Sequence, residues 1–303
     1  MRSIKTPCAL LIYVTAMLAG LIPVAAHAVC HGMVLHAHRG SPTAAENSLS
    51  AVRLAIQGEW DGAEIDIQQL RDQEWVLHHD AHLGRTTSLQ GYSTRDLDSA
   101  TWRELRMKDR QGRVTNELAP FLSDVIALPE YQDKILNVEI KQFSGTCDAT
   151  IQAVSQLRRG RPLGGWFITS IDRRQLQCVR KIDPKGYAGQ IVLDPQALAR
   201  ESRIRSRANR ISPPVIDAAW LRRLQQEVMA PVGVHVDINT LAANPSLLTD
   251  AKILNVPVFT YHLGADKKHA ETLRATARRT GLLPSGAIIN GSASVFCDLI
   301  GPR

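Results

Sequence analysis

Ionisable side chains recur in this sequence at the ends of four short apolar runs. The four runs are "MVLHAH" (33–38), "GAEIDI" (62–67), "WVLHH" (75–79) and "ILNVEI" (135–140). The ionisable residues at the ends of these runs include His38, Arg39, Glu64, Asp66, His79, Glu139 and Lys141. Carboxylates, imidazoles and fixed cations gathered in one place could bind a metal ion, move protons and neutralise an anionic substrate.

The spacing of the acidic residues favours a metal site. Glu64 and Asp66 are two residues apart, as are Glu139 and Lys141, and alternate side chains of a strand point to the same side. Three carboxylates can therefore converge. Ionised carboxylates in a partly dry site repel one another, and a hard divalent cation removes that repulsion by binding their oxygens. An oxygen-rich ligand set favours Ca²⁺ or Mg²⁺ over Zn²⁺.

The histidines suit the hydrolysis of a phosphate ester. Beside a metal ion, one histidine could manage the proton of the attacking oxygen and the other could protonate the leaving alkoxide, and His38 and His79 hold these places. Arg39 and Lys141 could neutralise the phosphate oxygens. Neighbouring side chains of a strand face opposite ways, so only one residue of the pair 78–79 should reach the centre. The histidines for which we expect a structural hydrogen-bonding role are His36, His78, His82 and His262.

Short apolar runs alternate with amphipathic stretches along most of the chain, a rhythm typical of parallel βα units. One such stretch begins near Asn47 or Ser48, either of which could cap a helix, and ends at Gly58. The further strand candidates are "GWFITS" (165–170), "QIVLD" (190–194), "GVHVDI" (233–238), "VPVFTYH" (256–262) and "GAIIN" (286–290).

Nine strand candidates predict an α/β fold, a TIM-type (β/α)8 barrel in which one segment is not a barrel strand. The pattern is weakest in 185–240, so we place the extra segment there. A doubly wound open sheet is the alternative, but no GxGxxG or GxxxxGK loop follows any candidate. In a barrel, the ionisable residues described above would share the carboxyl ends of the strands, where barrel active sites form.

The longest irregular part of the chain is 81–120. It holds several charges and turn residues but too few apolar positions for a core of its own. We expect it to be an inserted excursion from one barrel loop, after the third strand candidate.

The first 28 residues differ in kind from the rest. Two basic residues precede an apolar stretch close to the roughly 20 residues that span a bilayer, and "AHA" (26–28) fits a small-x-small cleavage site. This pattern predicts a signal peptide at 1–28, one domain at 29–303, and an exported, periplasmic or secreted protein with no stable membrane span after cleavage. A retained anchor and a lipoprotein attached at Cys30 are the alternatives.

Composition sets the remaining limits. The 303 residues are 44% hydrophobic and 21% charged, as in an ordinary globular protein. Removal of 1–28 leaves 34 of the 36 basic side chains against 29 acidic ones. The densest basic run, 200–212, could contact anionic lipid headgroups or phosphates, but we expect a solvated surface there. It lacks the interleaved aromatic residues of a single-stranded nucleic-acid platform, so we expect no nucleic-acid partner.

Four cysteines follow the predicted cleavage site, and their spacing does not resemble a zinc site. An even number in an exported chain permits two disulfides. Cys30 and Cys297 lie near the two ends of the mature chain, which would meet in a closed fold. The pairing we favour is therefore Cys30 with Cys297 and Cys147 with Cys178, and free buried thiols are the alternative.

The ordered motifs resemble those of the glycerophosphodiester phosphodiesterase family. They are "HRG" (38–40) followed by "ENS" (46–48), "GAEIDIQ" (62–68), "VLHHDAHLGRTT" (76–87), "ELAPFLSDVI" (117–126) and "NVEIK" (137–141). The resemblance implies a TIM-type barrel, one divalent metal ion, Ca²⁺ or Mg²⁺, and hydrolysis of a small glycerophosphodiester to sn-glycerol 3-phosphate and an alcohol. It is strongest over 33–141, and the second half departs from the family pattern at "TSID" (169–172), "FTYH" (259–262) and "NG" (290–291).

The resemblance also implies roles for individual residues. It makes His38 and His79 the catalytic acid and base, and Arg39 and Lys141 the phosphate contacts. Glu46 is implied as a metal ligand or as an acid that orients one. The metal ligands that it implies are Glu64, Asp66 and Glu139.

Two other functions remain open from the sequence. A related metal-dependent phospholipase acting on sphingomyelin or lysophospholipids would use the same histidine pair, but it would need an apolar or membrane-binding loop beside the site, and the sequence shows none. A non-catalytic barrel that binds phosphodiesters would tolerate the loss of a histidine, and neither expected histidine is missing.

Overall fold

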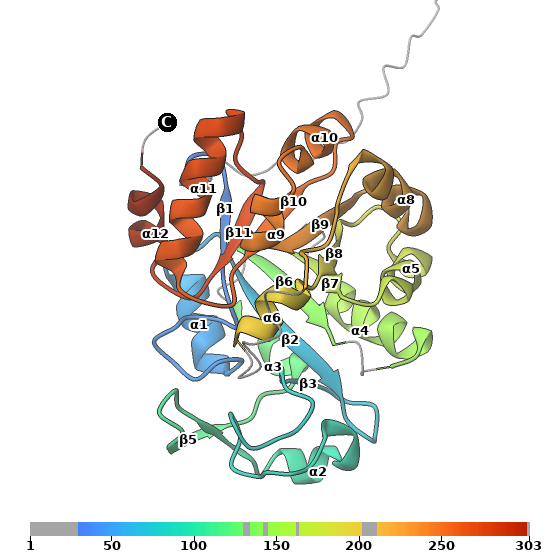
Figure 1. The fold of residues 1–303 in the computed structure, drawn as a ribbon. Helices are drawn as coiled ribbons and strands as arrows, with labels where there is room; N and C mark the ends of the chain where they lie inside the picture. The colour runs from blue at the N-terminus through green and yellow to red at the C-terminus, as the bar shows by residue number, and fades with distance from the viewer. Residues whose placement is uncertain (1–29, 130–133, 142–144, 162–163, 202–210, 302–303) are drawn as a thin grey trace, which may run out of the picture.

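Eight parallel strands form a closed barrel in the computed structural model, which describes residues 30–129, 134–141, 145–161, 164–201 and 211–301 (Figure 1). The barrel strands are β1 (Val34–Ala37), β2 (Gly62–Gln69), β6 (Ile135–Ile140), β7 (Trp166–Ser170), β8 (Ala188–Val192), β9 (Val232–Asp237), β10 (Val258–Tyr261) and β11 (Gly286–Ile289). Each strand pairs with its neighbour in chain order, and β1 pairs with both β2 and β11, which closes the ring. The predicted TIM-type barrel is confirmed.

Helices surround the barrel and cover its outer face. The main ones are α1 (Leu49–Gln57), α4 (Cys147–Gly160), α5 (Arg173–Ile182), α8 (Ala218–Val228), α10 (Leu247–Ile253), α11 (Asp266–Thr280) and α12 (Ala293–Ile300); shorter ones are α3 (Leu122–Ile126), α6 (Pro195–Glu201) and α9 (Ile238–Ala243). Polar side chains begin several of them: Ser48 accepts a hydrogen bond from the backbone of Ala51 at α1, and Asp217 caps α8 in the same way.

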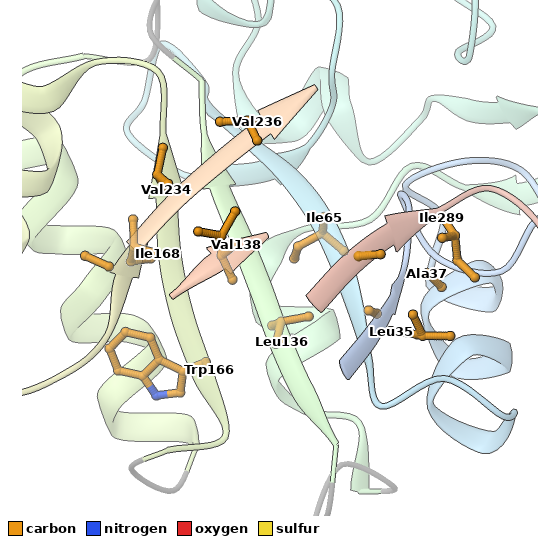
Figure 2. Packing of buried hydrophobic residues seen from close by; sticks show 14 of the residues in the cluster. Leu35, Ala37, Ile65, Leu136, Val138, Trp166, Ile168, Val234, Val236 and Ile289 are labelled. Atoms are coloured by element: carbon orange, nitrogen blue, oxygen red, sulfur yellow. The ribbon is translucent and has the colours of Figure 1, made fainter. Parts of the chain in front are cut away.

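Successive side chains of each barrel strand point alternately to the outer core and to the barrel interior. Leu35, Ile65, Val138 and Val236 are fully or almost fully buried and belong to one large core between strands and helices (Figure 2). The residues between them on the strands, including Glu64, therefore face the barrel interior. This alternation is what turns the carboxylates of two strands toward one another.

One strand candidate lies outside the barrel, and it is not the one that the sequence predicted. The strand β3 (Trp75–Leu77) runs antiparallel to β2 and extends the sheet beyond the ring. The interpretation that placed the extra segment in 185–240 was wrong, because β8 and β9 are both barrel strands. A parallel pair needs a crossover of a dozen or more residues, and the short link between β2 and β3 allows only an antiparallel hairpin.

The excursion at 81–120, called the inserted lobe below, follows β3 as predicted. It contains a 3₁₀ turn (Thr94–Asp96), α2 (Ser99–Trp102), β4 (Arg106–Lys108) and β5 (Val114–Leu118), and it extends from the lower end of the barrel in Figure 1. Its own apolar residues do not form a separate core, in agreement with the expectation that they are too few for a core of its own. Its scattered apolar residues join others from β3 and two nearby loops in a second core: Ala45, Leu70, Val76, Leu83, Leu97, Trp102, Leu105, Met107, Ala119 and Phe121.

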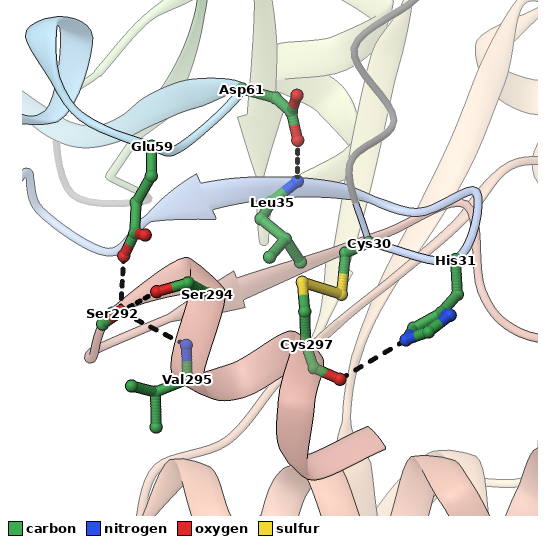
Figure 3. The surroundings of a disulfide bond; sticks show 9 residues. All are labelled: Cys30, His31, Leu35, Glu59, Asp61, Ser292, Ser294, Val295 and Cys297. Atoms are coloured by element: carbon green, nitrogen blue, oxygen red, sulfur yellow. Dashed lines mark hydrogen bonds between the residues drawn. A yellow bond between two sulfur atoms is a disulfide. The ribbon is translucent and has the colours of Figure 1, made fainter. Parts of the chain in front are cut away.

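Two disulfides link distant parts of the fold. Cys30 bonds Cys297, which ties the chain before β1 to α12 beside the barrel closure (Figure 3). Cys147 bonds Cys178 and joins α4 to α5. The pairing favoured from the sequence is confirmed.

The predicted signal peptide at 1–28 and most of the basic run at 200–212 lie outside the described residues. Among the residues that the structure does describe, no helix has the length and apolar character needed to cross a bilayer.

Candidate active site

Three carboxylates from two neighbouring strands converge at one end of the barrel. Glu64 and Asp66 lie on β2, and Glu139 is the partner of Asp66 in the register of β6. One ligand oxygen from each lies within 4.8 Å of the others. Within the described parts of the chain, no other group of three acidic, histidine or cysteine side chains comes close enough to share a metal ion. The three metal ligands implied by the sequence are thus brought together.

Burial and mutual repulsion act against ionisation of this cluster. Burial, followed by the charges of Asp66 and Glu139, raises the pKa of Glu64 well above its usual value. Burial also raises the pKa of Glu139, against the opposing charge of Lys141. Burial opposes ionisation of Asp66 too, but neighbouring cations, Lys141 first, outweigh it and hold the Asp66 pKa below its usual range. A cation bound to these oxygens would relieve the repulsion.

Two fixed positive charges border the carboxylate cluster. Lys141 Nζ lies 2.7 Å from Glu139 Oε1 and 3.3 Å from Asp66 Oδ1. Arg39 Nη1 lies 2.9 Å from Glu46 Oε1, and Arg39 Nε lies 3.3 Å from Asp66 Oδ2. Burial would lower the pKa of each cation, but the surrounding acids outweigh burial and raise both pKa values. Both side chains therefore stay charged beside the cluster.

A tight turn after β1 places Arg39. Its backbone adopts a left-handed conformation, with φ of 57°, and its N–H donates to Glu64 Oε2 at 2.9 Å. Gly40 follows with φ of 83°, and a Cβ there would lie 2.6 Å from the backbone carbon of Ala51 in α1. Only glycine fits this close approach, which accounts for the third residue of the "HRG" motif.

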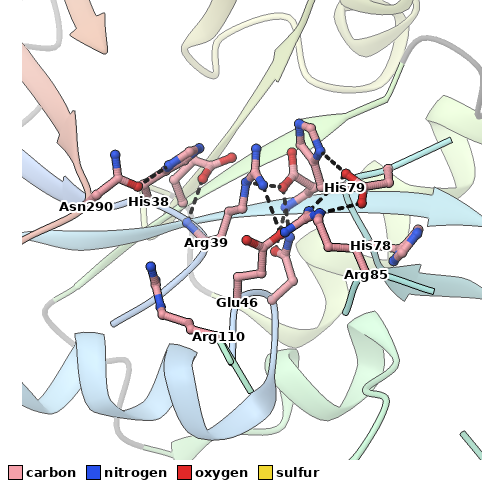
Figure 4. A network of polar contacts seen from close by, with 12 residues as sticks. His38, Arg39, Glu46, His78, His79, Arg85, Arg110 and Asn290 are labelled. Carbon is pink, nitrogen blue, oxygen red and sulfur yellow. Dashed lines mark hydrogen bonds and ion pairs between the residues drawn. The ribbon is translucent and has the colours of Figure 1, made fainter. Parts of the chain in front are cut away.

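His38 is held from the opposite side of the barrel closure. Its backbone N–H donates to the carbonyl of Ile289 on β11, and its Nδ1 lies 2.7 Å from the Oδ1 of Asn290 (Figure 4). Burial, followed by the charge of Arg39, lowers the pKa of His38 to about 4, although Asn290 and nearby acids oppose the shift. The imidazole is therefore uncharged near neutral pH.

His79 reaches the same site from β3, which is not a barrel strand. Because β3 runs antiparallel to β2, the chain turns back along β2, and His79 comes two residues after the end of β3. Its Nδ1 lies 2.8 Å from the Oδ1 of Asp80. Gln68, on the inner face of β2, donates to the carbonyls of His78 and Asp80 at 2.9 and 2.7 Å, which fixes the loop that carries His79.

Arg85 connects the two halves of the site. Its guanidinium contacts both oxygens of Asp80, at 2.7 and 2.9 Å, and Glu46 at 2.5 Å. Glu46 therefore lies between Arg39 and Arg85 in Figure 4 and not in the three-carboxylate cluster. These two hydrogen-bonded cations outweigh burial and lower the Glu46 pKa to about 2. Glu46 was implied either as a metal ligand or as an acid that orients a ligand. Its position between the two arginines matches the second role.

Asn47 holds Asp66 rather than capping a helix. Its Nδ2 donates to Asp66 Oδ2 at 2.8 Å, and its Oδ1 accepts the backbone N–H of Asp66 at 3.0 Å. Ser48 is the residue that caps α1. Sequence reasoning weighed both as caps and missed the contact with Asp66, as it missed Gln68 and Asn290. The sequence did offer one indication of this role. Asn47 belongs to the "ENS" motif, although Ser48 alone is enough to cap the helix.

The four histidines expected to have structural roles do not join the cluster of Glu64, Asp66 and Glu139. His36 is fully buried inside the barrel. His78 is also buried, and its ring makes a T-shaped contact with Trp102 of the lobe core, with 6.3 Å between the ring centroids. His262 follows β10, with its Nδ1 3.8 Å from Asp237 Oδ2, and His82 is exposed. As alternation predicted, His78 and His79 face different surroundings.

The fold and the site together define a (β/α)8-barrel protein whose acids, imidazoles and cations gather where strands end. The chain belongs to the glycerophosphoryl diester phosphodiesterase family, whose model matches residues 38–278. This match confirms the resemblance seen in the motifs and extends it well into the divergent second half.

Individual relatives cover less of the chain. A glycerophosphodiester phosphodiesterase of Caldanaerobacter subterraneus is 29% identical over 154 residues, which are 49% of this chain and 62% of that protein. The uncharacterized protein YqiK of Bacillus subtilis is 28% identical over 131 residues, 40% of this chain and 52% of its own length. This chain therefore matches between half and two thirds of the length of each of these two relatives.

Solved structures match almost the whole barrel. A phosphodiesterase of Oleispira antarctica, in complex with the product sn-glycerol-3-phosphate, superposes with a TM-score of 0.69 at 21% identity and covers 89% of this chain and 97% of that one. A glycerophosphodiester phosphodiesterase of Thermotoga maritima gives a TM-score of 0.60, also at 21% identity, over 88% of this chain and 98% of its own. These similarities establish the shared fold.

Proposed function

We propose that this protein hydrolyses small glycerophosphodiesters to sn-glycerol 3-phosphate and an alcohol, with Ca²⁺ or Mg²⁺ as cofactor. The observation that carries the proposal is the convergence of the cluster Glu64, Asp66 and Glu139 with two differently held histidines at one end of the barrel. Family membership supports the reaction class. The sn-glycerol-3-phosphate bound to the Oleispira protein supports the product.

The donor set fits a hard divalent cation. All three groups are carboxylates, and burial with mutual repulsion disfavours their charged forms when no cation is bound. Glu64, Asp66 and Glu139 would hold the ion, which as a Lewis acid supplies charge stabilisation at a phosphoryl oxygen. Arg39 and Lys141 provide the positive charge for the other phosphate oxygens.

The environments of the two histidines suggest opposite proton roles. His38 is uncharged and its Nδ1 is engaged by Asn290, so its Nε2 is free to accept a proton from the attacking oxygen. His79 has the Asp80 carboxylate 2.8 Å from its Nδ1, which holds the ring in place beside the cluster. We assign His38 as the general base and His79 as the general acid that protonates the leaving alkoxide.

A substrate panel tests this function. The full chain is treated with chelator and then assayed with restored Ca²⁺ or Mg²⁺ on glycerophosphocholine, glycerophosphoethanolamine, glycerophosphoglycerol and lysophosphatidylcholine. We expect metal-dependent release of sn-glycerol 3-phosphate from one or more of the first three, and loss of that release in His38→Ala. Turnover of lysophosphatidylcholine alone would favour the phospholipase, and no turnover of any ester by folded, metal-loaded protein would favour a binding barrel.

We also propose that the protein is exported, with residues 1–28 as its signal peptide and 29–303 as the mature domain. The two disulfides support this proposal, because such bonds persist in oxidising compartments. N-terminal sequencing of protein recovered outside the cytoplasm should give Val29 as the first residue. An intact Met1 in that fraction would contradict cleavage.

A further inference from the structure

The β4–β5 hairpin of the inserted lobe turns one face toward solvent. Burial alternates along β5, where Val114, Asn116 and Leu118 are exposed and the residues between them are half-buried. Val114 and Leu118 are 54% and 52% exposed. Arg106 is the partner of Leu118 in the β4–β5 register, so its exposed side chain lies on the same face. Apolar and basic groups thus share one surface.

The charge around this surface is mainly positive. The stretch 103–118, which includes the whole hairpin, contains four arginines and one lysine against three acidic residues. One of these acids, Asp109, is already engaged by Arg113 at 2.7 Å. An exposed apolar face bordered by excess arginine is complementary to a surface that offers both hydrocarbon and anionic phosphate.

The hairpin contacts α1 and the loop before it, and that loop carries Glu46 and Asn47 of the site. Glu117 of β5 accepts hydrogen bonds from the backbone and the hydroxyl of Ser50, at 2.8 and 2.6 Å. Arg110 donates to the carbonyl of Ala44 at 3.4 Å and appears in Figure 4 beside the network of Glu46. A surface that engages the hairpin would therefore lie next to the site.

We propose that the β4–β5 hairpin docks the protein on the surface of an anionic phospholipid bilayer, with Val114 and Leu118 at the headgroup boundary and the nearby arginines against lipid phosphates. The sequence showed no continuous apolar loop beside the site, because the two apolar residues are separated by three others and come to share one face only when β5 forms. This inference concerns an interaction beyond hydrolysis, so a binding measurement tests it whether or not the proposed function holds.

The experiment measures sedimentation of the full chain with vesicles of phosphatidylcholine, alone or mixed with phosphatidylglycerol. Val114→Ser/Leu118→Ser is compared with Ile253→Ser/Val295→Ser, a matched pair at residues 74% and 57% exposed on α10 and α12. All variants keep residues 1–29, so any affinity of that segment is common to all. Melting temperatures establish that each variant is folded.

We expect the wild type and the control pair to bind phosphatidylglycerol vesicles at low salt. The hairpin pair should bind about tenfold more weakly, because it loses two apolar contacts. Binding should also weaken as salt screens the arginines. Absence of binding by the wild type, or equal binding by the hairpin pair and the control pair, would overturn the proposal. So would a self-associated species that the hairpin pair loses without any vesicle binding, since the hairpin would then join two copies of the chain.

Discussion

The Nδ1 of His38 and the Oδ1 of Asn290 lie 2.7 Å apart, across the seam where β11 closes the barrel onto β1. Asn290 is itself fixed, because its backbone N–H donates to the carboxylate of Asp266 at the start of α11. A neutral amide oxygen at Nδ1 selects the tautomer that carries a proton on Nδ1 and leaves Nε2 open. The last strand of the barrel thereby sets the chemistry of a residue that follows the first.

Replacing Asn290 should change the action of His38 without removing it. In Asn290→Ala we expect kcat to fall about 10- to 100-fold with little change in KM, since a group that only orients another is lost. In Asn290→Asp the new carboxylate should raise the His38 pKa above its value of about 4. The base would then be protonated at higher pH, and the acidic limb of the kcat profile should move upward.

Ser292→Ala is the matched control for these variants. Ser292 caps α12 two residues beyond Asn290 and accepts from the backbone of Val295. Its loss should cost about 1 kcal/mol of stability and leave the pH profile in place. Equal pH profiles for Asn290→Asp and Ser292→Ala would contradict an influence of residue 290 on His38.

The carboxylate cluster could be predicted because alternation within each strand and the parallel order of the strands are enough to bring it together. Alternation along β2 fixes the common direction of Glu64 and Asp66, and the parallel register brings Glu139 beside them. The contact of His38 with Asn290 joins residues 252 positions apart, so no local pattern contains it. It depends on barrel closure, and "NG" in the sequence looked only like a departure from the family.

The one error in the fold has a similar origin, as does the shared core of the lobe. Trp75–Leu77 reads as a buried strand, which it is, but apolar composition does not tell an antiparallel extension from a barrel strand. The short link between β2 and β3 is the feature that distinguishes the two, because it permits only an antiparallel pair. In the inserted lobe, single residues such as Trp102 and Met107 gather with Val76 into a core only after the chain has folded back.

A metal ion should reverse the effect of Glu64 on stability. The folded-state pKa of Glu64 is raised, so the stability linked to its protonated form is present below pH about 4.5 and is lost as pH rises through the folded-state pKa. In the presence of chelator, the melting temperature of the wild type should therefore be lower than that of Glu64→Gln, and the difference should grow as the pH rises. With Ca²⁺ or Mg²⁺ the order should invert, because the wild type has the full ligand set.

Thermal melting from pH 4 to 8, with and without metal, checks this prediction. Activity of Glu64→Gln should fall roughly 10²-fold or more at the same time, since the bound cation contributes several kcal/mol to the transition state. Identical melting of both proteins with metal would remove Glu64 from the ligand set.

The two disulfides should contribute unequally to stability. In the loop-entropy model, the Cys30–Cys297 bond, which closes 267 residues, is worth roughly 5–6 kcal/mol, and the Cys147–Cys178 bond, which closes 31, roughly 4 kcal/mol. Replacing the first pair by serine should lower the guanidinium midpoint more than replacing the second. A larger loss from the second pair would show that packing between α4 and α5, and not chain entropy, determines the effect.

The paired histidines give the sharpest test of the proposed chemistry. His38→Ala and His79→Ala should each lower kcat by about 10²- to 10⁴-fold, the usual contribution of a positioned acid or base, while metal affinity stays close to that of the wild type. The double variant should be little worse than the worse single one, because the two residues act as a unit. His78→Ala is the internal control. It removes a ring packed against Trp102, so it should lower the melting temperature but keep kcat. If His78→Ala were inactive although folded, and His79→Ala active, the acid would be residue 78, and the loop held by Gln68 would have to turn its other histidine toward the carboxylates.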